Sequence, residues 1–349
     1  MWRLLNARQH FTDWSRDWDE LNTACNHGHP LLCAAYVEPL VRHYATPRVV
    51  LAVRERPGRP DAMALIEPRR GIWQAFRPAQ TQIAPVLAPS AEALMTLLGA
   101  LPATCLALDL YCLDPDYSPA RALAAMPANE HADQAATLAI GLDSDFATYW
   151  NSRSRGLRQQ VRRALRKAEA EVAPVALDYI DDPEGLVAAF ERYADLESRG
   201  WKAEGGTAIA VGTRQGEFYG DLISGFGAGG RAGIYELRFG GRLAASQIVL
   251  LGPRMLVTLK TTHDEALRPY SPGTLLDYLM IEREYGARRV PAIEYYTNAN
   301  TEMMRWGTSH RTVSNLRLYR RPWMALATDR LRRWRNRWQR TGAATGTAA

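Results

Sequence analysis

The sequence of 349 residues has few cysteines and no long apolar run. Its four cysteines, Cys25, Cys33, Cys105 and Cys112, are too few and too scattered for a disulfide-stabilised scaffold. The sequence contains no stretch of about 18 apolar residues, the length needed to span a membrane. Its first residues, MWRLLNARQHF, lack the apolar run of a signal peptide. These absences predict a cytoplasmic protein, with a peripheral position at the inner membrane face as a further option.

The sequence also lacks the residue orders that are typical of covalent catalysis and of metal binding. It shows no Ser-His-Asp order and no evident cysteine nucleophile, so we expect no covalent intermediate. Two thiols and two imidazoles do occur within Cys25–Cys33, and both groups can ligate zinc. Their spacing matches no established zinc pattern, and His-x-His before Pro30 suits a loop that leads into a helix. We therefore expect no metal site.

The composition is that of a globular protein with a sizeable core. Apolar residues make up 47% of the chain and charged residues 23%. At roughly 100–200 residues per domain, the length predicts two domains. We place an N-terminal domain at 1–136, a C-terminal domain at 137–322, and a basic helix with a tail at 323–349.

The stretch 234–297 has the clearest order of predicted elements. Runs of β-branched and aliphatic residues predict strands, and Gly pairs predict the turns between them. The predicted elements are strands at Tyr235–Phe239, Leu243–Leu251 and Met255–Thr262, a helix that begins at Ser271-Pro272-Gly273 and ends near Gly286, and a strand at Val290–Tyr295. Ser is a good N-cap, and Pro fits the first helical turn. A strand that leads to a Gly-containing helix N-terminus predicts an anion site, because free N–H groups and the positive dipole end point outward there.

Two ordered series of residues resemble one branch of the GNAT superfamily of acyl-CoA N-acyltransferases. The first series is Leu243-Ala244-Ala245, Lys260, Asp264, Tyr270-Ser271-Pro272-Gly273, Leu275-Leu276 and Gly286. The second is Glu197, Gly200-Trp201-Lys202 and Gly205-Gly206-Thr207-Ala208. The branch is the BioF2-like, or "acetyltransferase 6", family, which is related to cellulose-biosynthesis-associated acetyltransferases and to Fem-type peptidyltransferases.

The resemblance implies an α/β fold (an α+β mixed sheet) built from tandem GNAT-like domains. The first 140 residues read as helix, three strands, helix and strand, which repeats the order of the second half without a counterpart of Ser271-Pro272-Gly273. The resemblance therefore implies that the first half is largely structural. A Pro- and Ala-rich stretch, 115–133, is the expected linker.

The implied reaction is transfer of an acyl group from acetyl-CoA or another acyl-CoA to an amine by direct attack. The N–H groups of Gly273, Thr274 and Leu275, together with Ser271 and Lys260, would hold the donor, and the strand Met255–Thr262 would stabilise the oxyanion. The base candidates are Glu197, Asp264 and Glu294, with His263 as a fourth option. The expected acceptor-side residues are Trp201, Lys202 and Tyr296.

Glu197 is a candidate because it falls on the apolar stripe of a predicted helix that begins at Asp182-Pro183-Glu184. Burial raises the pKa of a carboxyl group toward the range of a general base. A salt bridge to Arg199, to Lys202 or to the arginine-rich helix that ends near Glu171 is the equally supported alternative.

Two basic helices leave the choice of partner open. One runs to about Glu171 and carries seven basic residues from Arg153 to Lys167, and the other is Asp329–Arg340, which contains Trp334 and Trp338. Each suits an anionic partner, such as tRNA or an anionic membrane surface, but a solvated helix face or a docked terminal helix explains them equally.

Three functions follow from the sequence. The first is an acyl-CoA-dependent N-acyltransferase acting on an amino sugar, an amino acid or a precursor in polysaccharide or cell-envelope biosynthesis. The second is a Fem-type transferase that uses aminoacyl-tRNA. The third is a non-catalytic GNAT-like binding protein in polysaccharide assembly.

Overall fold

The computed structural model describes residues 1–56, 58–117, 120–123, 129–199, 209, 212–321 and 323–324. They form two compact units of mixed α/β structure. Unit 1 contains Met1–Phe11, the described residues of Thr46–Gln134 and those from Val313 onward. Unit 2 contains Thr12–Ala45 and the described residues of Ala135–Thr312. The helices α2 and α3 therefore belong to unit 2, although sequence analysis assigned them to the N-terminal domain.

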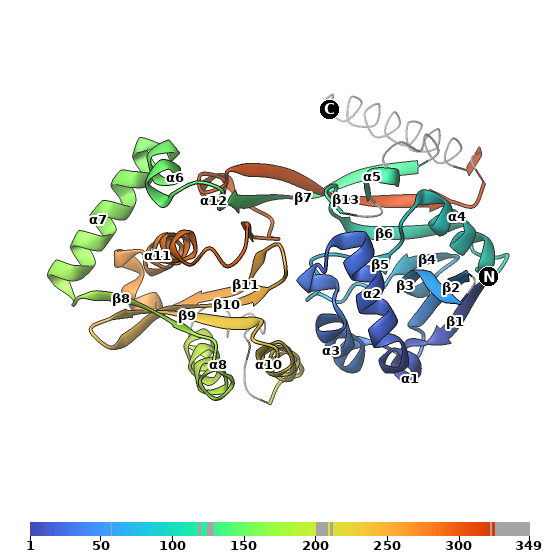
Figure 1. Cartoon of the computed structure of the whole chain (residues 1–349), viewed down its shortest axis with the longest axis horizontal. Helices are drawn as coiled ribbons and strands as arrows, with labels where there is room; N and C mark the ends of the chain where they lie inside the picture. Colours follow the sequence, from blue (N-terminus) through green and yellow to red (C-terminus); the bar gives the residue numbers. More distant parts are fainter. Residues whose placement is uncertain are drawn as a thin grey trace, which may run out of the picture. The chain divides into compact units, whose positions relative to one another are not determined.

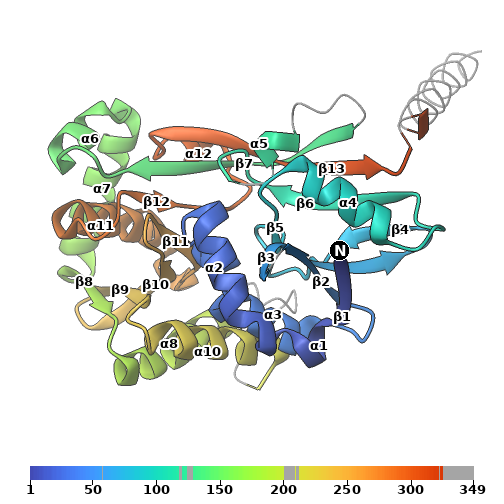
Figure 2. The same cartoon turned by 45° about the vertical axis from the view of Figure 1, so that its right-hand side comes forward.

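Unit 1 is a mixed sheet with helix α4 on one face (Figure 2). Its strands are β1 (Trp2–Asn6), β2 (Val50–Arg56), β3 (Arg59–Arg69), β4 (Ile72–Ala75), β5 (Val86–Leu87), β6 (Ala107–Leu113) and the end of β13 (Ser309–Tyr319). Its helices are α1 (Ala7–His10), α4 (Ala91–Ala100) and α5 (Ala120–Leu123). The strand order is β1-β2-β3-β4-β6-β13, with β5 paired to β3 and β4 parallel to β6. Leu94, Leu97 and Leu98 of α4 bury their side chains against Leu108 and Leu110 of β6.

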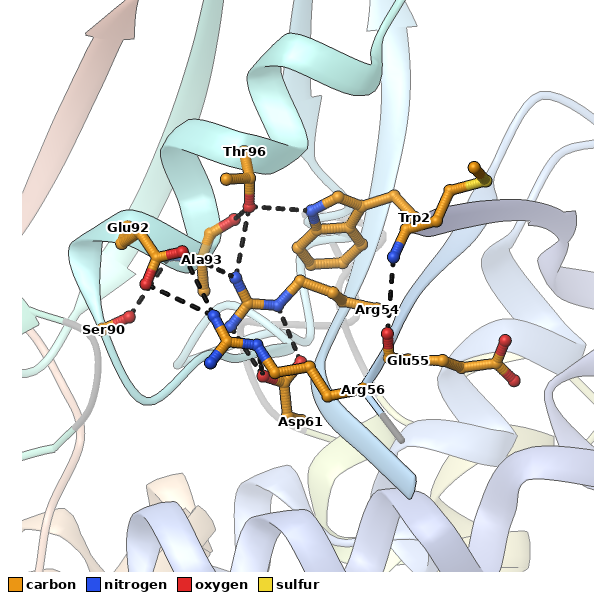
Figure 3. Close-up of polar contacts among 10 residues, drawn as sticks. Trp2, Arg54, Glu55, Arg56, Asp61, Ser90, Glu92, Ala93 and Thr96 are labelled. Carbon is orange, nitrogen blue, oxygen red and sulfur yellow. Dashed lines mark hydrogen bonds and ion pairs between the residues drawn. The ribbon is translucent and has the colours of Figure 1, made fainter. Parts of the chain in front are cut away.

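Arg54 anchors the β2–β3 hairpin of unit 1 to α4 (Figure 3). Its side chain is buried, and its guanidinium forms a bidentate pair with Asp61 at 2.7 and 2.9 Å. It also donates to Thr96 of α4 at 3.3 Å and lies 5.8 Å from the ring centroid of Trp2. The indole N–H of Trp2 donates to the same Thr96 hydroxyl at 3.1 Å. One buried cation thus joins β1, β2, β3 and α4.

In unit 2 the sheet has the strand order β7-β12-β11-β10-β9-β8. Its strands are β7 (Asn129–Gly141), β8 (Val175–Ile180), β9 (Ala232–Phe239), β10 (Arg242–Leu251), β11 (Leu256–His263) and β12 (Ala292–Glu294). Its helices are η1 (Thr12–Trp14), α2 (Ser15–Asn26), η2 (Pro30–Leu32), α3 (Ala34–Tyr44), α6 (Phe146–Ser152), α7 (Arg155–Glu171), α8 (Pro183–Ser198), α10 (Arg214–Gly227), η3 (Glu265–Tyr270), α11 (Pro272–Ala287) and α12 (Thr301–Met304). Strands β7 and β13 each have residues in both units.

Helices cover both faces of the unit 2 sheet (Figure 1). Helices α6, α7 and α11 lie on one face, and α8 and α10 lie on the other, where α3 packs against α10. The core beneath α11 contains Leu275, Leu276 and Met280 of that helix with Tyr235 and Ile293 of the sheet. None of the helices among the described residues is both long enough and apolar enough to cross a membrane.

Several predicted boundaries are corrected by the structure. The single long helix expected from Leu142 to Glu171 is two helices, because Ser154 accepts from the N–H of Leu157 at 3.3 Å and starts α7 anew. The expected linker 115–133 contains α5 and the first residues of β7. Strands β1 and β8 were not predicted, whereas α8 begins at Pro183, where the sequence placed a helix.

Candidate functional site

Strands β11 and β12 separate after a short parallel pairing. In the described chain they pair only at Leu256–Ile293 and Val257–Glu294, and β11 then continues to His263. A register shift in the β10–β11 ladder places an irregularity at Leu259, within this second half. Backbone groups of β11 beyond Val257 that point toward the β12 side thus lie outside the ladder. We call this region the β11–β12 gap; it is where the sequence placed the oxyanion-stabilising strand.

Helix α11 begins beside the end of β11, after η3. Its first residues differ from the expectation at Ser271, which has a left-handed backbone (φ 53°) and makes no side-chain cap hydrogen bond. The Ser271 carbonyl instead accepts from the N–H of Leu275 at 3.1 Å. Leu275 therefore does not offer the free N–H group that was expected of it.

Gly273 and Thr274 keep the properties of an anion site. Among the described residues, no hydrogen bond from either N–H group to a loop or cap carbonyl is recorded, and Pro272 has no N–H to offer. A Cβ atom added at Gly273 would meet no atom within 4 Å. The helix N-terminus thus has room beside two N–H groups and the positive end of the dipole, so it fits a phosphate group.

The side chains of Glu294 and Tyr296 point away from α11. Ile293 and Tyr295 belong to the core beneath α11, so the residues that alternate with them face α8 and α10. Lys260 of β11 lies on this same face, because its Nζ is 5.9 Å from the ring centroid of Tyr219 of α10. Lys260 is therefore across the sheet from Gly273, and not beside it as the donor-binding expectation required.

Arg311 connects Glu294 to Tyr296. Its Nη2 lies 2.8 Å from Glu294 Oε2, and its guanidinium carbon lies 5.2 Å from the ring centroid of Tyr296. The Glu294 carbonyl accepts from the hydroxyl of Thr258 at 3.3 Å, which ties the end of β12 to the start of the gap. Tyr296 Oη lies 2.8 Å from Nε2 of His29, a residue of the loop before η2.

Glu197 is buried at the end of α8, as its position on the apolar stripe predicted. Its Oε1 accepts from the hydroxyl of Tyr193 at 3.2 Å, and its Oε2 accepts from the N–H of Ile209 at 2.7 Å. Burial raises the pKa of Tyr193 and of Tyr219 well above the usual value, and the nearby Glu197 charge adds to both shifts. The two carboxylate oxygens of Glu197 thus link the end of α8 to the backbone at Ile209.

Asp264 has two structural contacts. Its Oδ1 caps η3 by accepting from the N–H of Ala266 at 2.9 Å, and its Oδ2 forms an ion pair with Arg242 at 2.6 Å. His263, the fourth option for a base, lies 3.5 Å from Glu265 and is partly exposed. These contacts are those of a helix cap and of surface ion pairs.

Two predicted acceptor residues, Trp201 and Lys202, lie outside the described residues, as does the basic segment Asp329–Arg340. The other basic helix, α7, is described, and it buries Leu157, Val161 and Ala164 while most of its arginines face solvent. No ion pair links these arginines to an acidic side chain anywhere in the described chain; they are Arg155, Arg158, Arg162, Arg163 and Arg166. At the far end of α7, Lys167 Nζ lies 5.0 Å from the ring centroid of Tyr270, next to the start of α11.

The sequence did not indicate four residues that the structure places at the site. His29 and Arg311 come from segments far from β12 along the chain, and no local pattern links them to it. Asp277 and Tyr295 face each other beneath α11, with the Tyr295 hydroxyl donating to Asp277 Oδ1 at 3.3 Å. Burial raises the pKa of Asp277 to about 7. An acid on an otherwise apolar helix face was the signal that could have identified Asp277.

The His/Cys segment of the N-terminal region is engaged in other contacts. The Nδ1 atom of His29 accepts from the N–H of Leu31 at 3.2 Å and its Nε2 meets Tyr296, while Cys33 Sγ donates to the Pro30 carbonyl at 3.2 Å. Within the part of the chain that the structure covers, no three His, Cys, Asp or Glu side chains are placed to hold a metal ion.

Comparison with known proteins connects this geometry to one family. Residues 155–301 match the family model described as an acetyltransferase (GNAT) domain. A crystal structure of FemX shares the fold at 11% identity and a TM-score of 0.56, over 89% of this chain and 98% of that one. A conserved protein of unknown function from Bacteroides thetaiotaomicron VPI-5482 does so at 11% identity and a TM-score of 0.57, over 88% and 97%. Comparison with curated proteins gives no match.

The matched segment runs from α7 to the start of α12, so it contains the β11–β12 gap and the N-terminus of α11. The mixed α/β fold expected from the sequence is confirmed, and residues 155–301 match a GNAT domain, as the resemblance implied. The chain thus carries, at residues 155–301, an acetyltransferase domain of the GNAT type.

Proposed function

We propose that this protein transfers an acyl group, acetyl in the simplest case, from acyl-CoA to an amine by direct attack. The acceptor class that we propose is an amino sugar, an amino acid or a precursor of a polysaccharide or of the cell envelope. One observation carries the proposal: among the described residues the N–H groups of Gly273 and Thr274 have no recorded acceptor, and a Cβ added at Gly273 would meet open space, at the helix start that follows the strand bordering the β11–β12 gap.

The start of α11 would hold the pyrophosphate of the donor. Two backbone N–H groups and the helix dipole bind a phosphate without a cationic side chain. Ser271, whose left-handed backbone lets η3 lead directly into the helix, is the N-cap residue of α11. The thioester would then enter the β11–β12 gap, where N–H groups of β11 outside the ladder can donate to a developing oxyanion.

The acceptor would approach from the face of α8 and α10, where Glu294, Tyr296 and Lys260 lie. A neutral amine attacks the thioester carbonyl, the C–S bond breaks, and the amine proton must be removed. We assign Glu294 to this proton, because it lies where the strands separate and on the face from which the acceptor would approach; its Oε2 also pairs with Arg311 at 2.8 Å.

One observation favours the second candidate function, transfer from aminoacyl-tRNA. The solvent-exposed arginines of α7 have no acidic partners among the described residues, and such a row suits the phosphates of a nucleic acid. A non-catalytic protein in polysaccharide assembly would bind its partner through the same basic face of α7, and the β11–β12 gap would have no role.

A thermal-shift titration with coenzyme A, acetyl-CoA and, in parallel, total tRNA distinguishes these functions. A ligand at about 100 times its dissociation constant adds about 2.7 kcal/mol to the free energy of unfolding. We expect coenzyme A and acetyl-CoA to raise Tm and tRNA to leave it unchanged. A shift in Tm with tRNA alone would replace the proposal with the aminoacyl-tRNA function. No shift with any of these ligands would favour the third function, a non-catalytic binding protein.

Gly273→Val and Gly286→Val form a matched pair for this titration. Both glycines lie on α11, one at each end, and an added Cβ would meet no atom within 4 Å at either. Both variants should change the free energy of unfolding by a similar small amount, because the change in helix propensity from Gly to Val is the same at both positions. Only Gly273→Val should lose the shift with coenzyme A. Equal loss in both variants, or in neither, would contradict the proposed donor site.

A further inference from the structure

Helix α7 brings positive charge to the start of α11 (Figure 1). It contacts both η3 and α11, and the Nζ atom of Lys167 lies 5.0 Å from the ring centroid of Tyr270. Tyr270 is the last residue of η3 and directly precedes Ser271, the N-cap residue of α11. The ammonium group of Lys167 therefore lies near the helix start that carries the N–H groups of Gly273 and Thr274.

One side of α7 carries both Lys167 and a second cation. The residues of this side, spaced by four, three and four positions, are Gly156, Gln160, Arg163 and Lys167. At the far end of the side, Arg305 Nη1 donates to Gln160 at 3.3 Å and joins the end of α12 to α7. Arg163 lies between this contact and Lys167, and its side chain is exposed. We call Arg163 and Lys167 the flank cations.

The flank cations have no acidic partner within the part of the chain that the structure describes. The acids of η3 have other contacts, since Asp264 caps η3 and pairs with an arginine, and Glu265 lies 3.5 Å from His263. Glu171, one turn after Lys167, forms no ion pair with it among the described residues. Positive charge that no described carboxylate balances thus lies next to the proposed donor site.

A coenzyme A donor carries phosphate at two places. One is the pyrophosphate, and the other is a phosphomonoester on the ribose of its nucleotide end. A phosphomonoester has a charge of about −1.5 to −2 at pH 7 and three acceptor oxygens. Backbone N–H groups at a helix start suit the first phosphate group, and a lysine ammonium, which binds phosphate as a point charge, suits the second.

We propose that Lys167, with Arg163 beside it, binds the ribose 3′-phosphate of the donor and makes the site selective for coenzyme A over dephospho-coenzyme A. The inference rests on the proposed function and adds to it a specificity determinant that α7 supplies. The Tyr270 ring restricts the position of the ammonium group by a cation–π contact. The backbone at Gly273 and Thr274 would bind the pyrophosphate of either compound, so the discrimination resides in the flank cations.

Three variants of α7 test this assignment. Lys167→Gln removes the charge, whereas Lys167→Arg keeps it and can still lie over the ring of Tyr270. Arg162→Gln is the matched control, because Arg162 is exposed and lacks an acidic partner in the described chain. It is five residues before Lys167 and so lies on another side of the helix. The control removes one positive charge from the same helix and reports the effect of net charge alone.

Isothermal titration calorimetry of the full chain at low salt measures Kd for coenzyme A and for dephospho-coenzyme A. We expect the wild type to bind coenzyme A about tenfold more tightly, as one charge-assisted hydrogen bond provides. Lys167→Gln should lose this difference through weaker binding of coenzyme A alone, with the Kd of dephospho-coenzyme A unchanged. Lys167→Arg and Arg162→Gln should keep the difference, and added salt should reduce it in the wild type.

Three results would overturn the inference. One is equal affinity of the wild type for the two compounds, which removes this inference and leaves the donor site in place. Another is an equal loss for both compounds in Lys167→Gln, which shows that Lys167 only supports the packing at Tyr270. The third is the same loss in Arg162→Gln as in Lys167→Gln. If the wild type binds neither compound and releases no thiol from acetyl-CoA with any amine, the proposed function fails and this inference fails with it.

Discussion

The guanidinium of Arg311 lies 2.8 Å from the carboxylate of Glu294, and the two side chains are only 10% and 9% exposed. Removing one member of such a pair leaves a buried charge without its partner. We expect Arg311→Gln to lower the free energy of unfolding by about 3–5 kcal/mol. The double variant Glu294→Gln/Arg311→Gln should lose less than the sum of the single variants. Urea unfolding measures all four proteins, and strict additivity would show that the pair is not coupled.

Arg54 and Arg56 provide a test of burial in unit 1, because both contact Asp61 and Glu92 (Figure 3). The side chain of Arg54 is 6% exposed, whereas that of Arg56 is 58% exposed. We expect Arg54→Ala to lower the free energy of unfolding by about 2–3 kcal/mol, and Arg56→Ala by about 0.5 kcal/mol or less. Equal effects in urea unfolding would contradict the structural role of the buried cation.

Asp277 should make stability depend on pH. Burial raises its pKa to about 7, against about 4 in an unfolded chain, and the hydrogen bond from Tyr295 offsets this only in part. Between pH 4 and 7 the folded protein keeps a proton that the unfolded chain releases, so the free energy of unfolding falls as the pH rises. Above about pH 7 both states are ionised, and the penalty is constant.

The variant Asp277→Asn isolates this effect, because its amide stays neutral and can still accept from Tyr295. Relative to the wild type, it should gain stability as the pH rises from 5 to 8, with little difference near pH 4. Urea midpoints of both proteins across this range provide the measurement. A difference that does not change with pH would show that Asp277 is ionised in the folded protein throughout.

Asp264 gives a prediction that separates a helix cap from a catalytic base. We expect Asp264→Ala to lower the free energy of unfolding by about 1 kcal/mol, since the cap of η3 is lost. Asp264→Asn keeps a cap and should lose only a few tenths, because the ion pair with Arg242 is exposed. Loss of thiol release in Asp264→Asn with stability intact would restore Asp264 as a base candidate.

Local patterns predicted the central elements of unit 2 well. Strands β9, β10 and β11 begin and end within three residues of the expected positions, because Gly turns and β-branched runs specify short hairpins. The helix that begins at Pro272 was also predicted, but the expected side-chain cap by Ser271 is absent. Ser271 favours a side-chain cap by propensity, whereas the short η3 that precedes it forces a left-handed backbone there.

The chemical environment of the site could not be read from the sequence for a physical reason. The Glu294–Arg311 and His29–Tyr296 contacts depend on tertiary packing, and no periodicity encodes which distant side chains meet. The same holds for Lys260, whose side of the sheet depends on the irregularity at Leu259. An added residue in one strand turns every following side chain to the other face.

The contact between α3 and α10 also bears on the order in which unit 2 can be completed during synthesis. Arg42 pairs with Asp221 at 3.0 Å, 179 positions later, and Tyr36 meets Phe218 with ring centroids 6.0 Å apart. At about 5–20 residues per second, a ribosome delivers α10 roughly 10 to 35 s after α3. During that interval the apolar side of α3 has no final partner, and the loop that carries His29 precedes it. Unit 2 therefore cannot be completed until α10 has been synthesised. We expect chaperones to bind the exposed apolar side of α3 during this interval.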